Sequence, residues 1–398
     1  MGKINVLLVD DEPSILKVVQ RAMQATIDCD VSTALNGDQA LRIMEKNPFD
    51  VLVSDISMPG MDGTTLVNVV SELYPKTTRL IFSARSGGEI GLKTAGSAHQ
   101  FYLKPQDISL IAKRTKNILR LRDFLPAEGL DQIVSHIKTL PSMPSICLAL
   151  ENELKKPNVS MDAVGKIVEK DIAMSAKILQ LVNSAFFGMR ERVTRPSQAA
   201  VLLGGEVLKS LLLGLHIFTE WTKKTIPCFS IHELWSHSLN VASSAQEIAL
   251  AEGLDKKTAD EFYIAGLFHD IGKIIMADNL PESCELIQKI VHERGGTLLA
   301  AEKEILGATH TEAGAYLMAL WGFPDNVIQA CAHHHYPSAM EQHGFNPACA
   351  VHVANVLDYE RAFTGKIVKE TMDSNYLARE GFTNKIDKWR NAINKTAT

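Results

Sequence analysis

The sequence predicts an α/β domain with a doubly wound parallel sheet, followed by a nearly all-helical region. Three observations support this division. Short apolar runs rich in Val, Leu and Ile alternate with helical patterns up to about residue 122, as buried parallel strands do. Beyond about residue 123 these runs cease, and apolar residues recur at intervals of three and four. Prolines and glycines divide that second region into helices of about 10 to 20 residues.

Polar side chains end the four clearest apolar runs of the first region. They are Asp10 and Asp11 after residues 4–9, Asp55 after residues 51–54, Ser83 after residues 78–82, and Lys104 after residues 100–103. The carboxyl ends of parallel strands meet at one edge of a sheet, where such folds bind ligands. Three carboxylates at that edge suit Mg²⁺, a hard cation that prefers oxygen ligands and also binds phosphate oxygens. One acid can then attack a phosphoryl group while the hydroxyl and the ammonium hold its oxygens.

In this order, these residues resemble the receiver domain of two-component response regulators, and the resemblance covers residues 1–122. It implies a flavodoxin-like fold with five parallel strands. It also implies that Asp55 accepts a phosphoryl group from a histidine kinase or a phosphotransfer protein. The Mg²⁺ ion for this reaction would be bound by Asp10, Asp11 and Asp55 itself.

The same resemblance assigns roles to three further residues of the domain. Ser83 and Lys104 would act catalytically by closing on the aspartyl phosphate, and Phe101 would be the switch that moves inward. The competing interpretation is an ordinary doubly wound domain whose strand-end acids only cap helices. Single acids at strand ends are common, whereas this set in this order is not, so we favour the receiver.

Composition and charge narrow the range of partners. The chain has 398 residues, of which 46% are hydrophobic and 22% charged, as expected of a soluble protein with two or three domains. The formal net charge of −5 argues against a nucleic-acid partner, because such domains usually carry a basic stripe. The basic cluster in residues 113–122 is spaced with apolar residues at helical intervals. We interpret it as the solvated face of the last receiver helix rather than as a phosphate-binding surface.

The cysteines and the hydropathy pattern indicate a cytoplasmic protein. Six cysteines are scattered without a C-x-x-C pair, which is typical of a reducing compartment. The first residues lead directly into a strand without a secretory leader, and no run of about 18 apolar residues occurs. We therefore expect no membrane span.

Three sequence segments in the second region resemble the HDOD domain, a helical relative of HD-type metal-dependent phosphohydrolases. These segments are residues 140–144, 171–188 and 198–204. The resemblance implies a linker at residues 123–132, an all-helical HDOD output domain at residues 133–340 and a C-terminal helical extension at residues 341–398. The resemblance also implies that the domain mediates regulatory interactions, since HDOD domains are more often interaction modules than enzymes.

Histidines and one aspartate in the helical region match part of the HD metal site. His237, followed by the adjacent pair His269 and Asp270, matches the first three residues of the HD pattern. An adjacent His-Asp pair can reach one ion at a helix end, and imidazole with carboxylate suits iron, manganese or zinc. The remaining candidates resemble extra ligands of the HD-GYP cyclic dinucleotide phosphodiesterases, and they are His310, His334 and His335.

The sequence departs from the HD pattern at the last ligand. Asn355, in the segment 351–357, stands where HD hydrolases have an aspartate. A neutral carboxamide is a weaker ligand than a carboxylate, so we expect weak or substoichiometric binding of a transition metal. The Gly-Tyr-Pro segment of the HD-GYP branch is also missing. A histidine on an apolar helix face is usually a core residue, which is the competing interpretation here.

Two functions from different classes therefore remain open. The first is a response regulator that signals through a non-catalytic HDOD domain to a downstream protein, by a changed contact or a changed homodimer. The second is a phosphorylation-gated metal-dependent phosphohydrolase that acts on a nucleotide or a cyclic dinucleotide. Lys273 would bind substrate phosphate in the second case, whereas otherwise it is a partner of a helix dipole.

Overall fold

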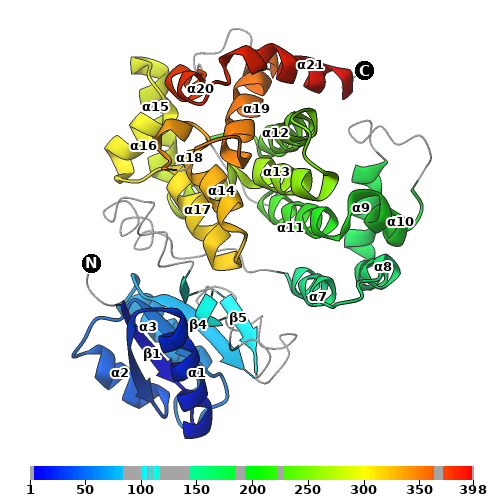
Figure 1. Ribbon diagram of the computed structural model, residues 1–398. Coiled ribbons are helices and arrows are strands. Elements are labelled where there is room, and N and C mark those ends of the chain that lie inside the picture. Colours follow the sequence, from blue (N-terminus) through cyan, green and yellow to red (C-terminus); the bar gives the residue numbers. More distant parts are fainter. Residues whose placement is uncertain are drawn as a thin grey trace. The chain divides into compact units, whose positions relative to one another are not determined.

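The computed structural model describes residues 4–83, 98, 100–104, 108, 111–113, 115–116, 144–183, 193–222, 228–341, 343–362 and 371–396. They form two compact units, an N-terminal α/β unit and a helical unit (Figure 1). The predicted linker at residues 123–132 and the predicted start of the HDOD domain at residue 133 lie outside the described residues. The two units differ in fold class in the way that the sequence predicts.

The N-terminal unit is built on a sheet of five parallel strands, which confirms the predicted fold class. The strands are β1 (Ile4–Val9), β2 (Cys29–Ala34), β3 (Val51–Ser54), β4 (Thr78–Ser83) and β5 (Gln100–Leu103). Their order in the sheet is β2-β1-β3-β4-β5. Because the chain reverses its direction across the sheet between β1 and β3, ligands of such folds bind beyond the carboxyl ends of these two strands.

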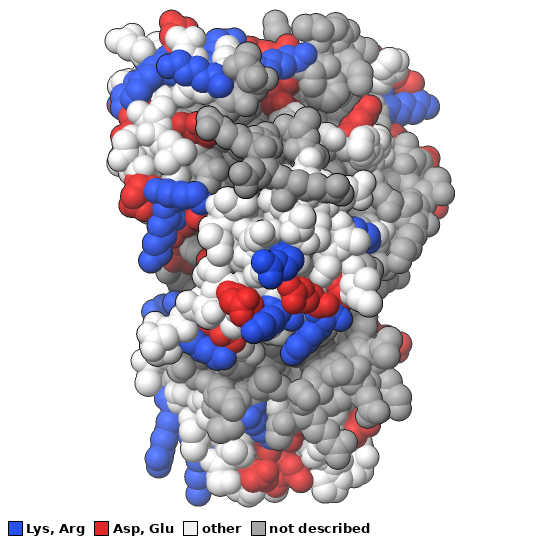
Figure 2. Space-filling view, turned by 90° about the vertical axis from the view of Figure 1, so that its right-hand side faces the viewer, with Lys and Arg blue, Asp and Glu red and all other residues white. Residues whose placement is uncertain are grey.

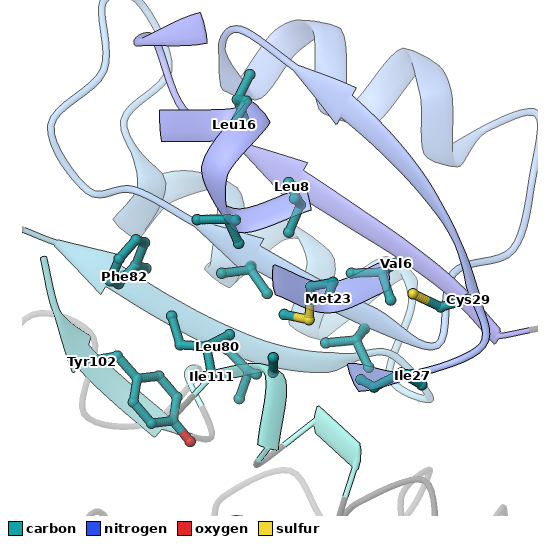
Figure 3. Packing of buried hydrophobic residues seen from close by; sticks show 14 residues of the cluster. Val6, Leu8, Leu16, Met23, Ile27, Cys29, Leu80, Phe82, Tyr102 and Ile111 are labelled. Atoms are coloured by element: carbon teal, nitrogen blue, oxygen red, sulfur yellow. The ribbon is translucent and has the colours of Figure 1, made fainter. Parts of the chain in front are cut away.

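Alternating residues of the strands point to opposite faces of the sheet and pack into two hydrophobic cores, one on each face. On one face, Val6 and Leu8 pack with Met23 of helix α1 (Pro13–Thr26), as Figure 3 shows. On the other face, Leu7 and Leu52 pack with α2 (Gly37–Met44) and α3 (Gly63–Leu73). Each fully buried aliphatic side chain stabilises the fold by about 1.5 to 3 kcal/mol. The two cores hold β1 and β3 firmly, and with them the residues that follow.

The helical unit contains no strand among its described residues. Its helices up to residue 279 are α7 (Ser145–Leu154), α8 (Met161–Glu169), α9 (Ile172–Val182), α10 (Pro196–Leu203), α11 (Gly205–Thr222), α12 (Ile231–Ala251), α13 (Lys256–Phe268) and α14 (Ile271–Asn279). They are followed by α15 (Pro281–Arg294), α16 (Leu298–Leu306), α17 (His310–Trp321), α18 (Asp325–His333) and α19 (Pro347–Ala362). Helix α12 packs against α13 and α19, which brings three candidate site segments together.

Local sequence signals explain where several of these helices begin. Ser230, Asp255 and Thr297 each accept a hydrogen bond from the backbone N–H three residues later, at the start of α12, α13 and α16. Pro196 and Pro281 occupy the first turn of α10 and α15, where a missing N–H costs nothing. Capping residues and prolines therefore mark several helix starts in this region, in line with the division into helices that its prolines and glycines predict.

The C-terminal segment folds back onto the helical unit. It contains α20 (Ser374–Arg379) and α21 (Ile386–Thr396), and α21 packs against α12. Trp389 is fully buried, and its Nε1–H donates to Oε1 of Glu252 at 2.9 Å. Lys385 and Lys388 also pair with this carboxylate. Glu252 thus ties the end of α12 to the C-terminal helices.

Three features of the described residues are their surface charge, the hydropathy of their helices and the state of their cysteines. On the face shown in Figure 2, basic and acidic side chains lie interspersed. Among the described residues, no single helix is long and apolar enough to cross a membrane, although the bent pair Pro196–Leu203 and Gly205–Thr219 passes that test by length and composition together. None of the six cysteines, all of which are among the described residues, forms a disulfide.

Candidate functional site

Three carboxylates of the N-terminal unit meet beyond the ends of β1 and β3. Asp10 follows β1 and Asp55 follows β3, and the pairing of Val9 with Ser54 places them side by side. The backbone N–H of Asp55 donates to the carbonyl oxygen of Val9 at 2.8 Å. Carboxylate oxygens of Asp10, Asp11 and Asp55 lie within 4.8 Å of one another. The structure therefore brings together the three acids that the sequence predicts as Mg²⁺ ligands, and oxygen donors at this spacing fit that ion.

A lysine that directly follows β5 joins two of these acids. Nζ of Lys104 lies 2.6 Å from Oδ2 of Asp10 and 2.6 Å from Oδ2 of Asp55. Burial alone would lower the pKa of Lys104, but its hydrogen bonds with the two acids outweigh this effect and raise it. Burial raises the pKa of Asp10, and the hydrogen bond from Lys104 offsets only part of that. One ammonium against three carboxylates leaves negative charge for a divalent ion.

The two other predicted receiver residues are Ser83 and Phe101. Ser83 ends β4 and is buried, and its carbonyl oxygen accepts the backbone N–H of Lys104 at 2.9 Å. This bond holds Ser83 and Lys104 at the same sheet edge, as predicted. The side chain of Phe101 lies outside the described residues, so its role as a switch stays a prediction.

A glycine that sequence reasoning missed closes the loop around Asp55. Oδ1 of Asp55 accepts the backbone N–H of Ile56 at 2.6 Å, and its carbonyl oxygen accepts the hydroxyl of Ser54 at 2.7 Å. A Cβ on Gly63 would lie 1.7 Å from the carbonyl oxygen of Asp55. Only glycine allows this approach, because any side chain would push the start of α3 away from the loop. The Asp62-Gly63 pair was the available signal.

The helical unit gathers all six predicted metal ligands in one buried cluster. His237 comes from α12, and His310 begins α17. His269 and Asp270 form the junction of α13 and α14, so this adjacent pair sits at a helix end as predicted. The last two ligands follow α18, and they are His334 and His335. Every one of the six is buried.

Asp270 lies between two groups of histidines. Its Oδ2 is 3.4 Å from Nε2 of His269 and 3.7 Å from Nε2 of His237. Its Oδ1 is 3.3 Å from Nε2 of His310 and 3.5 Å from Nε2 of His334. The two potential donor sets are His237, His269 and Asp270, and Asp270, His310, His334 and His335. A carboxylate with one oxygen toward each set can serve two ions.

The outer nitrogens of four histidines are held by protein acceptors. Nδ1 of His269 pairs with the carbonyl oxygen of Gly266 at 2.7 Å, and Nδ1 of His334 pairs with that of Cys331 at 3.0 Å. Nδ1 of His237 lies 2.6 Å from Oδ2 of Asp358, and Nδ1 of His310 lies 2.8 Å from Oε2 of Glu302. Such partners keep the proton on Nδ1 and turn Nε2 inward as a ligand.

Several inward atoms of the cluster have no hydrogen-bond partner among the described residues. They are Nε2 of His237, His269 and His334, and Oδ1 of Asp270. Leaving a buried polar atom unsatisfied costs about 1 to 3 kcal/mol, so a group of such atoms facing each other needs an explanation. Nitrogen and carboxylate donors in this arrangement fit a transition metal ion.

The protonation states of the cluster also fit a metal. Burial lowers the pKa of His269, and it holds those of His334 and His335 well below the usual value, so these imidazoles are neutral. Burial alone would raise the pKa of Asp270, but Lys273 at 2.6 Å and the histidines hold it well below its usual value. Neutral imidazoles and an ionised carboxylate are the forms that coordinate metals.

His310 is the exception among the buried histidines. Burial favours its neutral form, but Glu302 and Asp270 outweigh that effect and raise the pKa of His310 to about 9. Without a metal, His310 therefore carries a proton that an ion on Nε2 would replace.

Comparison with known sequences assigns each unit to a family. The sequence model of the response regulator receiver domain matches residues 6–116, and that of the HDOD domain matches residues 140–337. The transcriptional regulatory protein PrrA of Mycobacterium tuberculosis is 32% identical over 182 residues, which are 44% of this chain and 77% of PrrA. The chain belongs to the response regulators. Its second domain is an HDOD domain.

One further relative and one solved structure are similar to this response regulator. An uncharacterised protein of Treponema pallidum is 28% identical over 217 residues, which are 53% of this chain but only 40% of the relative's length. The crystal structure of an HDOD domain protein of unknown function from Geobacter sulfurreducens has a TM-score of 0.53 at 21% identity and covers 71% of this chain and 98% of that chain. At this identity the likeness shows the fold alone.

In this response regulator, α19 carries the departure from the HD pattern. Asn355 is buried, and its Oδ1 has no hydrogen-bond partner in the part of the chain that the structure describes. Asp358 lies one turn further along the helix and reaches His237. Sequence reasoning missed Asp358 and Glu302, because no local pattern links an acid to a histidine that is 121 or 8 residues away.

A further histidine supports the cluster without being in it. The backbone N–H of Asp373, which can only donate, lies 2.8 Å from Nε2 of His352. Nδ1 of His352 must then carry the proton, and it donates to the carbonyl oxygen of His334 at 2.7 Å. His352 thus joins the start of α20 to a candidate ligand.

Proposed function

We propose that Asp55 of this response regulator accepts a phosphoryl group from a histidine kinase or a phosphotransfer protein. The observation that supports this most strongly is the buried carboxylate of Asp55, 2.6 Å from Lys104 and beside Asp10 and Asp11. Asp10, Asp11 and Asp55 would hold Mg²⁺, which supplies positive charge to the transferring phosphoryl group.

The contacts of Asp55 indicate which oxygen reacts. Its Oδ1 is fixed by the backbone N–H of Ile56, whereas its Oδ2 is held by the long side chain of Lys104. We infer that Lys104 turns from Oδ2 to a phosphoryl oxygen as Oδ2 bonds to phosphorus. The bond from phosphorus to the donor's imidazole nitrogen breaks, and its electron pair leaves with the imidazole. Ser83 would hold a second phosphoryl oxygen.

The test is modification of the purified chain by phosphoramidate with Mg²⁺, followed by intact mass measurement. We expect one phosphoryl group on the wild type and none on Asp55→Asn. Asp62→Asn is the matched control, because Asp62 is outside the group of three acids and caps α3 by accepting the backbone N–H of Thr65 at 2.7 Å. Labelling of Asp55→Asn at the wild-type rate would show that the assignment is wrong.

We further propose that the HDOD domain binds a transition metal, namely iron, manganese or zinc, and transmits the signal to a downstream protein without turnover. The six clustered ligands and their unsatisfied inward atoms support metal binding. Asn355 in place of an acid is the reason to expect no efficient hydrolysis. Phosphorylation would change a contact or a homodimer of this domain.

The second candidate function is a phosphorylation-gated hydrolase of nucleotides or cyclic dinucleotides, which two donor sets around Asp270 favour. Elemental analysis and an activity screen in Mn²⁺ or Fe²⁺ decide between the two. We expect bound metal and little turnover. Robust turnover that His269→Ala abolishes would replace the non-catalytic proposal with the enzyme.

A further inference from the structure

The cluster around Asp270 is uneven. We call Asp270, His310, His334 and His335 the His310 half, and His237, His269 and Asp270 the His237 half. We propose that the His310 half binds one metal ion tightly and that the His237 half binds a second ion weakly, because Asp358, the acid in contact with His237, holds this histidine instead of metal. This inference rests on the proposed metal binding and adds an order of affinity to it.

The His310 half has a full set of donors. Three imidazoles and Oδ1 of Asp270 supply four ligand atoms, which is the number a zinc-like ion takes in a closed site. Glu302 fixes His310 twice, because its carboxylate pairs with Nδ1 at 2.8 Å and accepts the backbone N–H at 2.9 Å. A ligand held in this way loses little freedom when it binds an ion.

The His237 half has one donor fewer and a neutral neighbour. Asn355 and Asp358 are three residues apart on α19 and so share one helix face. Oδ2 of Asp358 is 2.6 Å from Nδ1 of His237, on the side of the ring away from Nε2. A carboxylate at Nδ1 cannot also reach an ion at Nε2. That leaves Asn355, whose Oδ1 has no hydrogen-bond partner among the described residues, as the side chain on this face that could complete the half.

Charge favours one ion over two. The cluster and its direct partners contain three carboxylates, Asp270, Glu302 and Asp358, against the ammonium of Lys273. The resulting two negative charges are neutralised by one divalent ion. A second ion would leave uncompensated positive charge in a buried site, which is costly. An added carboxylate at position 355 would reduce that excess.

The full-length protein tests this by metal titration calorimetry and by elemental analysis after dialysis, with excess Mg²⁺ to occupy the receiver and Zn²⁺ as the probe. We expect the wild type to retain about one Zn²⁺ per chain and to bind a second weakly. Asn355→Asp should retain about two. Asp358→Asn should leave the first ion unchanged and weaken the second by about 10- to 100-fold, because it loosens His237.

Asp260→Asn is the matched control, since Asp260 is a half-buried acid that pairs with Gln246 outside both halves. It should bind Zn²⁺ as the wild type does. Two ions of equal affinity in the wild type, or an Asp358→Asn variant that loses both ions equally, would overturn the inference but leave metal binding intact. No bound Zn²⁺ at all would instead contradict the proposed metal binding itself. If Asn355→Asp does not fold, Asp358→Asn decides alone.

Discussion

Lys104 is expected to be the charge that keeps the receiver site folded when Mg²⁺ is absent. Its side chain is 7% exposed, and those of Asp10 and Asp55 are 5% and 9% exposed. Lys104→Met removes the ammonium but keeps an apolar stem near the ring of Phe82, whose centroid is 5.8 Å from Nζ. Two buried carboxylates then face each other without a cation.

The loss of stability in Lys104→Met is set by the relief of that repulsion that costs the least free energy. Breaking a buried ion pair costs about 3 to 5 kcal/mol. Protonating one aspartate limits this cost, and at pH 7 it requires about 4 kcal/mol from a reference pKa near 3.9. The variant should therefore lose about 3 to 4 kcal/mol at pH 7, and the loss should shrink by about 1.4 kcal/mol for each pH unit on acidification.

The direction of this pH dependence follows from the raised pKa of the aspartate that takes up a proton in the variant. Such a group stabilises the folded state below its unfolded pKa, and this contribution is lost as the pH rises through the folded pKa. The loss relative to wild type is thus largest at neutral pH. Mg²⁺ should restore stability, and so should Asp55→Asn combined with Lys104→Met, because each relieves the repulsion between the carboxylates of Asp10 and Asp55.

Hydrogen exchange of β1 and β3 in the full-length chain measures this local stability. Exchange of these strands should be faster in Lys104→Met at pH 7 than at pH 5, relative to wild type at each pH. An equal loss at both pH values that Mg²⁺ does not reduce would refute the electrostatic reasoning. It would indicate that Lys104 acts by packing.

Two further predictions concern the helical unit. Burial alone would raise the pKa of Glu252, but two lysines and a tryptophan of the C-terminal helices outweigh this and lower it to about 2. Because those lysines are partly exposed, Glu252→Gln should destabilise the unit by about 1 to 2 kcal/mol at pH 7 in urea unfolding, and the difference should vanish as the pH falls from about 4.5 toward 2. Glu293→Gln, in an exposed pair 3.9 Å from Lys289, should change nothing, and an equal effect would contradict the prediction. A Cβ on Gly272 would lie 1.8 Å from the carbonyl oxygen of His310, so Gly272→Ala should reduce retained Zn²⁺ in elemental analysis; wild-type retention would show that α14 adjusts freely.

The sequence predicted the sheet because its buried strands are apolar on both faces. β1 and β3 show this clearly, and the acids at their ends then predict the site. β2 (Cys29–Ala34) produced no apolar run, because it is an edge strand and its residues from Asp30 to Thr33 are all at least partly exposed. Only the family resemblance implied a fifth strand.

The members of the histidine cluster around Asp270 could be predicted as candidate ligands, whereas the residues that support them could not. His269 and Asp270 could be placed at a helix end from their neighbouring pattern. The partners of the other histidines depend on how distant helices pack, so no periodicity indicates Glu302, Asp358 or His352. Asn355 was visible as a departure, yet its consequence depends on Asp358, which only the structure places beside His237.

We propose that a phosphoryl group at Asp55 alters the HDOD domain. Hydrogen exchange of residues 144–396 in the full-length chain, with and without beryllium fluoride and Mg²⁺, measures this directly. We predict altered exchange in part of that range for the wild type and none for Asp55→Asn, because a signal requires different contacts in the two states. Identical exchange of the wild-type helical domain in both conditions, with the receiver shown to be occupied, would contradict the claim.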